Sequence, residues 1–173
     1  VTLYESNSFG CDSTVVVNVT VNPLPAPTLS GVPKTCVQET REYSVADVIG
    51  NNYTWQVTNG SIVGFALGHS IQVYWPNPGN GSVSCRQSNP EGCDSIVAMN
   101  VIVDPLPNST VSGPVSICEY EAGVYTVSTA AGSNYTWSVT GGTPSSTTAG
   151  SYFPVNWNAG GSGSVTLYET DIN

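Results

Sequence analysis

The sequence has very little positive charge. Lys34, Arg41 and Arg86 are its only basic residues, against 12 carboxylates and a net charge of -9. Phosphate backbones and anionic lipid surfaces would be repelled, so nucleic acid is excluded as a partner. No run of 18 apolar residues occurs, which predicts no membrane insertion. Charged residues make up only 9 %, so Ser, Thr, Asn and Gly must form the surface, and this composition suits an extracellular or cell-surface protein.

The residue patterns that carry catalysis are also missing. His69 is the only histidine, and no Gly-x-Ser-x-Gly motif provides a nucleophile. No Cys-x-x-Cys pair is present to bind zinc. Calcium needs several oxygen ligands close together, and the carboxylates here are scattered. We therefore predict no enzyme, no metal site and no cofactor, with calcium as a minor alternative.

No window shows the 3.6-residue period of a helix. Short runs of β-branched and aromatic residues instead alternate with Gly, Asn and Pro, which is typical of strands joined by turns. Strands are expected at 41–47, 52–58, 70–75, 82–88 and 95–103, with weaker ones before Cys36 and near 61–65. Several short strands with frequent turns predict an all-β, immunoglobulin-like sandwich.

What the sequence does contain is an 82-residue repeat. Val1-Thr-Leu-Tyr-Glu-Ser6 returns as Val165-Thr-Leu-Tyr-Glu-Thr170, two periods later. Tyr53-Thr-Trp55 returns as Tyr135-Thr-Trp137, and Gly10-Cys-Asp-Ser13 as Gly92-Cys-Asp-Ser95. A constant spacing indicates tandem copies of one structural unit.

Proline-rich segments near residues 22–27 and 104–108 predict stiff spacers between these units. The expected domains are residues 1–25, the last two strands of a preceding repeat; 26–108, a complete repeat; and 109–173, a repeat that lacks its final strand. The expected architecture is beads on a rod. Both ends would then be unfinished sandwiches, completed by something outside this sequence.

Two tryptophans recur in each unit, and the simplest interpretation places them in the core. They are Trp55, Trp75, Trp137 and Trp157. A sugar-stacking platform is the alternative, but its best candidates, Phe65 and Tyr74, have no aromatic counterpart in the next copy.

Five cysteines occupy two repeated positions and one unique position. Cys11 matches Cys93, and Cys36 matches Cys118, while Cys85 has no counterpart and is predicted to be a free thiol. One disulfide per repeat would join Cys36 to Cys93 and contribute about 4 kcal/mol. Cys11 and Cys118 would then have disulfide partners outside this chain.

The ordered motifs resemble those of the PKD-like repeat. They run from Gly31 and Cys36 through Tyr53-Thr-Trp-Gln-Val57, Val73-Tyr-Trp75 and Gly92-Cys93 to Pro105-Leu-Pro107. This immunoglobulin-like module occurs in very large secreted surface proteins of Bacteroidetes. The Trp-Asp-Phe-Gly-Asp-Gly motif of ordinary PKD domains is absent, so the resemblance is to a divergent branch. It implies stalks of gliding-motility adhesins or other type IX secretion cargo.

The same resemblance implies O-glycosylation at Ser13 and Ser95, which follow Asp12 and Asp94. The alternative role of these residues is to form a tight turn beside Gly-Cys.

The predicted function is therefore a non-enzymatic stalk segment of a surface adhesin or filament. Its partners would be neighbouring repeats or identical chains, and surface glycans are a further option. One alternative is a filament subunit assembled by strand donation between chains. Residues 1–9 and 165–173 occupy the same position of the repeat, so the joined unit would contain one strand twice. The other is a carbohydrate-binding module.

Overall fold

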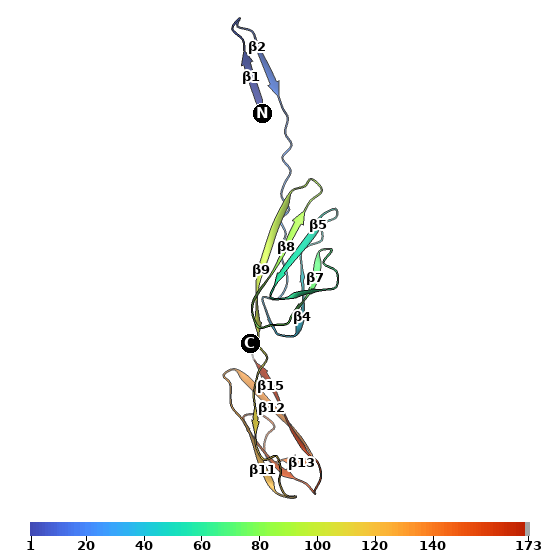
Figure 1. Ribbon diagram of the computed structural model, residues 1–173, viewed down its shortest axis with the longest axis vertical. Coiled ribbons are helices and arrows are strands. Elements are labelled where there is room, and N and C mark those ends of the chain that lie inside the picture. Colours follow the sequence, from blue (N-terminus) through green and yellow to red (C-terminus); the bar gives the residue numbers. More distant parts are fainter. Residues whose placement is uncertain (172–173) are drawn as a thin grey trace. The chain divides into compact units, whose positions relative to one another are not determined.

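The computed structural model describes residues 1–171, and every regular element in that range is a β-strand (Figure 1). This confirms the predicted all-β, immunoglobulin-like fold class. The strands are β1 (Thr2–Ser6), β2 (Asp12–Val16), β3 (Lys34–Cys36), β4 (Glu39–Ser44), β5 (Asn52–Thr58), β6 (Ser61–Val63), β7 (Ser70–Trp75), β8 (Gly79–Ser88), β9 (Asp94–Asp104), β10 (Val111–Ser112), β11 (Ala122–Val127), β12 (Ser133–Thr140), β13 (Gly142–Pro144), β14 (Tyr152–Trp157) and β15 (Ser164–Asp171).

The chain forms two compact units, Val1–Pro105 and Leu106–Asn173. The first unit contains a sandwich of two sheets, with strand orders β3-β9-β8-β5 and β4-β7-β6. Strand β9 lies between β8, to which it is antiparallel, and β3, to which it is parallel. Strand β9, the longest of the unit, is therefore hydrogen-bonded to β8 along nearly its whole length and to β3 at its C-terminal end.

Alternating side chains of these strands fill the core of the first unit. Tyr43, Val73, Trp75, Val83 and Val101 are fully buried. The rings of Tyr43 and Trp75 meet edge to face, with centroids 6.2 Å apart. Such pairs contribute beyond the area that they bury.

Strands β1 and β2 form a hairpin at the start of the first unit, with Thr2 opposite Val16 and Ser6 opposite Asp12. The Asn7 side-chain oxygen accepts hydrogen bonds from the backbone N–H groups of Phe9 and Cys11 and so fixes the turn. Hairpin β8–β9, one repeat later, uses Asn89 in the same way, with its side-chain oxygen 2.8 Å from the Cys93 nitrogen.

The second unit has the sheets β10-β11-β14-β13 and β12-β15. Its strands β11, β12, β13, β14 and β15 correspond to β4, β5, β6, β7 and β8 of the first unit. Within residues 106–171, no strand takes the place of β9, so β15 pairs with β12 on one side alone.

The core of the second unit contains the same kinds of side chain but is less complete. Tyr125, Tyr135, Trp137, Phe153 and Val155 are buried. Three side chains in or beside β15 are only half-buried: Val165 and Leu167 of the strand itself, and Trp157. Their counterparts Trp75, Val83 and Cys85 are fully buried.

Candidate functional site

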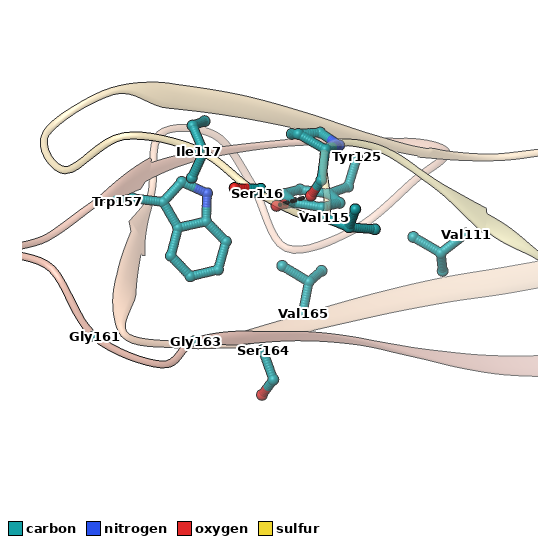
Figure 2. A pocket seen from close by; sticks show the side chains of 11 residues that line it. Val111, Val115, Ser116, Ile117, Tyr125, Trp157, Gly161, Gly163, Ser164 and Val165 are labelled. Atoms are coloured by element: carbon teal, nitrogen blue, oxygen red, sulfur yellow. Dashed lines mark hydrogen bonds between the residues drawn. The ribbon is translucent and has the colours of Figure 1, made fainter.

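A cavity of about 460 Å³ opens beside β15 in the second unit (Figure 2). The segment 114–117 borders one side of it, and residues 161–165 border the other. Figure 2 shows the Val165 side chain directed into the space between them, while Ser164 on the same strand points away. The Trp157 ring and Val111 lie at its two ends. Its side chains are mostly apolar, but more than half of the exposed lining is polar, and the backbone of Gly161 and Gly163 is bare on one wall.

The first unit shows what such a space holds. There β9 runs between β3 and β8, with Val101 opposite Gly81 and Val103 opposite both Gly79 and Thr35. Residues 81, 79 and 35 correspond to Gly163, Gly161 and Ile117, which all line the cavity. The cavity is therefore the place that β9 fills in the first unit.

The same track continues along β15. A second hollow, of about 490 Å³, is lined by Leu106, Pro107, Val111, Val165 and Leu167, among others. It shares Val111 and Val165 with the first. The residues of the first unit that correspond to Val165 and Leu167 are Val83 and Cys85, which lie opposite Met99 and Val97 of β9. The two hollows form one groove, and we call it the β15 groove.

The predicted Cys36–Cys93 disulfide is wrong in this fold. Cys36 lies opposite Asp104, at the end of β9, while Cys93 precedes Asp94, at its start. At about 3.3 Å per residue, β9 separates them by about 33 Å, far beyond the reach of a disulfide. No two of the five cysteines are bonded to each other, and Cys11 and Cys118 are exposed. Partners outside this chain for Cys11 and Cys118 stay a prediction.

Two of the cysteine positions lie beside the chain segments that connect repeats. The Cys93 sulfur lies 3.9 Å from the carbonyl oxygen of Asn22, in the segment that enters the sandwich. At the opposite end, the N–H of Val37, next to Cys36, donates to the carbonyl oxygen of Asp104 at 2.9 Å. Asn22 and Asp104 are one repeat period apart and so occupy the same position of successive repeats.

The structure places the other predicted residues as follows. Trp55, Trp75 and Trp137 are buried, and Trp157 is half-buried. Cys85 is fully buried among core side chains, and this burial raises the pKa of its thiol. Ser13 is exposed in β2, and Ser95 is half-buried in β9. Phe65 is 88 % exposed, and Tyr74 is half-buried.

Charged side chains form small local pairs. Arg86 donates to Asp94 across β8 and β9, and Lys34 lies 3.3 Å from Asp104. The Thr35 hydroxyl donates to Glu39 at 2.7 Å and, with the Cys36 N–H and nearby Arg41, lowers the pKa of that carboxyl. Across residues 1–171, no group of three or more His, Cys, Asp or Glu is arranged to hold a metal ion. Calcium binding stays an untested alternative.

Known proteins are similar to this chain in sequence or in fold. Residues 104–171 match the PKD-like domain family. No curated protein matches the chain. Among solved structures, the D00-D0 domain of intimin is 13 % identical with a TM-score of 0.40, and it covers 85 % of this chain and 94 % of its own. Murine CEACAM1b is 12 % identical with a TM-score of 0.35, covering 83 % and 92 %. The ectodomain of human desmocollin-1 is 10 % identical with a TM-score of 0.35, covering 96 % and 40 %.

No helix suited to crossing a bilayer is found in the described part of the chain.

Proposed function

We propose that this chain is a non-enzymatic structural segment of a large secreted surface protein, in which successive sandwiches hold adhesive parts away from the cell. The observation that carries this proposal is the recurrence, at the period of the sequence repeat, of the same strands and contacts in both units. In the first, the Trp55 indole N–H donates to the Gly68 carbonyl oxygen; in the second, Trp137 donates to that of Gly150. The match of residues 104–171 to the PKD-like family supports the same proposal.

The arrangement of β3 and β9 suits a segment that bears tension. A pull along the chain acts on β3 from its N-terminal side and on β9 from its C-terminal side. Because these strands are parallel, with Lys34 opposite Ile102 and Cys36 opposite Asp104, the pull shears their hydrogen bonds together instead of opening them one at a time. The first unit can therefore transmit force through its last strand to Asp104 and Pro105.

Protease treatment of intact source cells tests the surface location. Peptides of this chain should be released into the medium without lysis, because a segment of a secreted surface protein lies outside the cell, where the protease can reach it. Release only after lysis would contradict the proposal. A cytosolic protein of similar abundance serves as the control.

Type IX secretion, a Bacteroidetes source and glycosylation remain proposals that derive from the family resemblance. Ser13 and Ser95 are the acceptor candidates, and the exposed Ser13 is the more accessible one. A mass increase on the native peptides that contain these residues supports O-glycosylation. Native peptides with unmodified masses would refute it.

A second candidate function is assembly into filaments by strand donation between chains, in which a strand of another copy would pair with β15. Glycan binding has weaker support, because the second unit has Thr147 and Asn156 where the first has Phe65 and Tyr74. An aromatic platform would then exist in one unit alone.

A further inference from the structure

We propose that two copies of this chain pair side by side through β5 of the first unit, whose outer edge is open, so that the sheets of both copies join across a two-fold axis. This lateral contact goes beyond the structural role proposed above. Strand β5 is the last strand of the order β3-β9-β8-β5, with β8 on one side and no described strand on the other (Figure 1). An open strand edge is a template for pairing with another chain.

The second unit covers the equivalent edge with its own chain. There the Trp137 N–H donates to the Thr148 carbonyl oxygen at 2.7 Å, and the Gly150 N–H donates to that of Tyr135 at 3.3 Å. Trp55 corresponds to Trp137, and β5 pairs with β8 in the register that β12 keeps with β15. The Trp55 N–H therefore points away from β8, yet in the described part of the chain no backbone group pairs with it. Because this residue is only 6 % exposed and a buried N–H is rarely left without a partner, the edge lacks a strand.

Strand β5 also lacks the features by which proteins protect such an edge. Its residues Asn52–Thr58 include no charge and no proline, either of which would discourage a second strand. The opposite edge of the same sheet is β3, which has three residues and carries Lys34. Of the two edges, β5 is therefore the long and uncharged one.

An apolar loop lies beside this edge. Between β6 and β7, Phe65 and Leu67 are 88 % and 82 % exposed, and the next residue, Gly68, accepts the β5 indole N–H on its carbonyl oxygen at 3.0 Å. The second unit has Thr147 and Ala149 at the two apolar positions. Large exposed apolar side chains thus occur in the unit whose edge is open, and their burial against another chain would favour association.

A second copy fits this edge because it brings the same open strand and the same two apolar side chains. With Trp55 opposite Trp55 of the second copy, each N–H donates to the other's carbonyl oxygen, and Tyr53 lies opposite Val57. The backbone groups of these alternate residues all face the open side, as in any antiparallel ladder. The same patch is used on both copies, so the contact closes at a dimer.

Sedimentation velocity of the full chain tests the pairing, with a variant that takes its loop from the second unit. Replacing Gly64–Leu67 by Ser-Thr-Thr-Ala, the residues at 146–149, lets the loop close on the edge as it does there. The dimer dissociation constant should rise more than about tenfold, since burial of one large apolar side chain already contributes that much. Ile96→Thr, at a 69 % exposed position of β9, is the control and should dimerise like the wild type.

Two results of this experiment would overturn the proposal: a wild type that stays monomeric at all concentrations, or a loop variant that dimerises as tightly as the wild type. Thermal melting of the variants should match the wild type, because the replaced side chains are on the surface. Neither result touches the surface location, which protease treatment of cells tests separately.

Salt separates this seam from an interface of ion pairs. Each copy has a net charge of -9, so two copies repel, while β5 itself contributes no charge. Raising the ionic strength from about 0.01 M to about 0.15 M shortens the screening length from about 30 Å to about 8 Å and should tighten the dimer. A dimer that weakens over this range would contradict pairing through an uncharged edge.

Engineered disulfides test the register. In an antiparallel pairing about Trp55, Thr54 lies opposite Gln56 of the second copy. With oxidised glutathione, which is reduced to two thiols as one disulfide forms, Thr54→Cys together with Gln56→Cys should link position 54 of one copy to position 56 of the other. Mass spectrometry of non-reduced peptides identifies the link, and Thr54→Cys alone should not form it. Links between the two positions 54 would contradict the register, because these are offset by two residues, about 7 Å along the strands, and lie too far apart.

Discussion

The two sandwiches of this chain differ mainly in whether a strand fills the place beside β8 or β15. In the first unit β9 fills it, and Trp75, Val83 and Cys85 have no exposed surface. In the second, residues 106–171 provide no strand for that place, and Trp157, Val165 and Leu167 are partly exposed. The comparison shows that the last strand completes the core on this side of the sandwich.

The rest of the fold does not depend on that strand. The Tyr53 hydroxyl accepts from the Val48 N–H at 2.7 Å, and the Tyr135 hydroxyl accepts from the Ala130 N–H at the same distance. The hydroxyls of Tyr43 and Tyr125 each donate to a carbonyl oxygen, of Val32 and Pro114 respectively, at 3.0 Å. These hydrogen bonds therefore form whether or not a strand like β9 is present. The loss of burial in the second unit is confined to the side of the sandwich next to β15.

The largest effect is expected from a charge in the last strand of the first unit. Val101→Asp buries a carboxylate without a partner and should cost the first unit about 4 kcal/mol or more. Hydrogen exchange followed by mass spectrometry should show lost protection in β5, β8 and β9 with the second unit unchanged. The control is Ile102→Asp, whose side chain is half exposed on the other face. Equal effects of the two changes would contradict the assigned role of β9.

Removing the equivalent tryptophans compares the two cores directly. Trp75→Ala should destabilise the first unit by about 3–5 kcal/mol, as for a large buried aromatic residue. Trp157→Ala should cost the second unit about half as much, because part of its ring already contacts solvent. Chemical denaturation resolved by unit measures both. A larger loss for Trp157 would show that the groove is closed in solution.

The glycines beneath these tryptophans give a finer comparison. A Cβ on Gly81 would lie 2.5 Å from Cζ3 of Trp75, and a Cβ on Gly163 would lie 2.1 Å from Cζ3 of Trp157. Gly81→Ala should cost about 1–3 kcal/mol, since the indole is enclosed. Each Cβ would also approach a carbonyl oxygen, of Thr58 at 2.8 Å or of Thr140 at 2.9 Å, so this part of the cost is shared. Gly163→Ala should cost less despite the closer approach to the ring, because Trp157 can shift into the groove. Thermal melting of both variants provides the measurement, and equal losses would argue against an open groove.

The smallest expected effect is on pH dependence. Hydrogen bonding by Thr35 lowers the pKa of Glu39 in the folded state. The stabilisation is therefore present above the ordinary pKa of about 4.5 and is lost as the pH falls through the lower, folded-state value. Because 40 % of the Glu39 side chain is exposed, solvent screening should keep this stabilisation below about 1 kcal/mol. Glu39→Gln should flatten the acid side of the curve of stability against pH for the first unit; an unchanged curve would show that the hydrogen bond is not stabilising.

Much of this fold could be predicted from the sequence. Strands expected at 52–58 and 70–75 match β5 and β7, since alternating aromatic and β-branched residues bounded by turn residues are a local signal. The predicted domains, residues 1–25, 26–108 and 109–173, stay a prediction. The period could not give the parallel pairing of β3 with β9, because contacts between distant segments leave no periodic trace in either strand.

The cysteine pairing shows where a repeat misleads. A fixed period specifies that two positions recur, but it does not specify whether they meet within one copy or between copies. Cys36 and Cys93 recur together, yet β9 holds them at opposite ends. The position of each cysteine along β9 would have been the useful signal. Cys93 directly follows the turn before this strand, whereas Cys36 lies beside its last residue, so a full strand length separates them.

The turns made by Asn7 and Asn89 also bear on how the chain folds. A chain with several near-identical strands risks pairing a strand with the wrong copy. The Asn89 turn closes a loop of a few residues, whereas the wrong pairing closes one that is longer by a whole repeat. The longer loop costs about 2 kcal/mol more in closure entropy, and hairpins form within about 1–10 μs. Each strand is therefore captured by its own neighbour first, and exchange between copies must wait until a finished hairpin reopens.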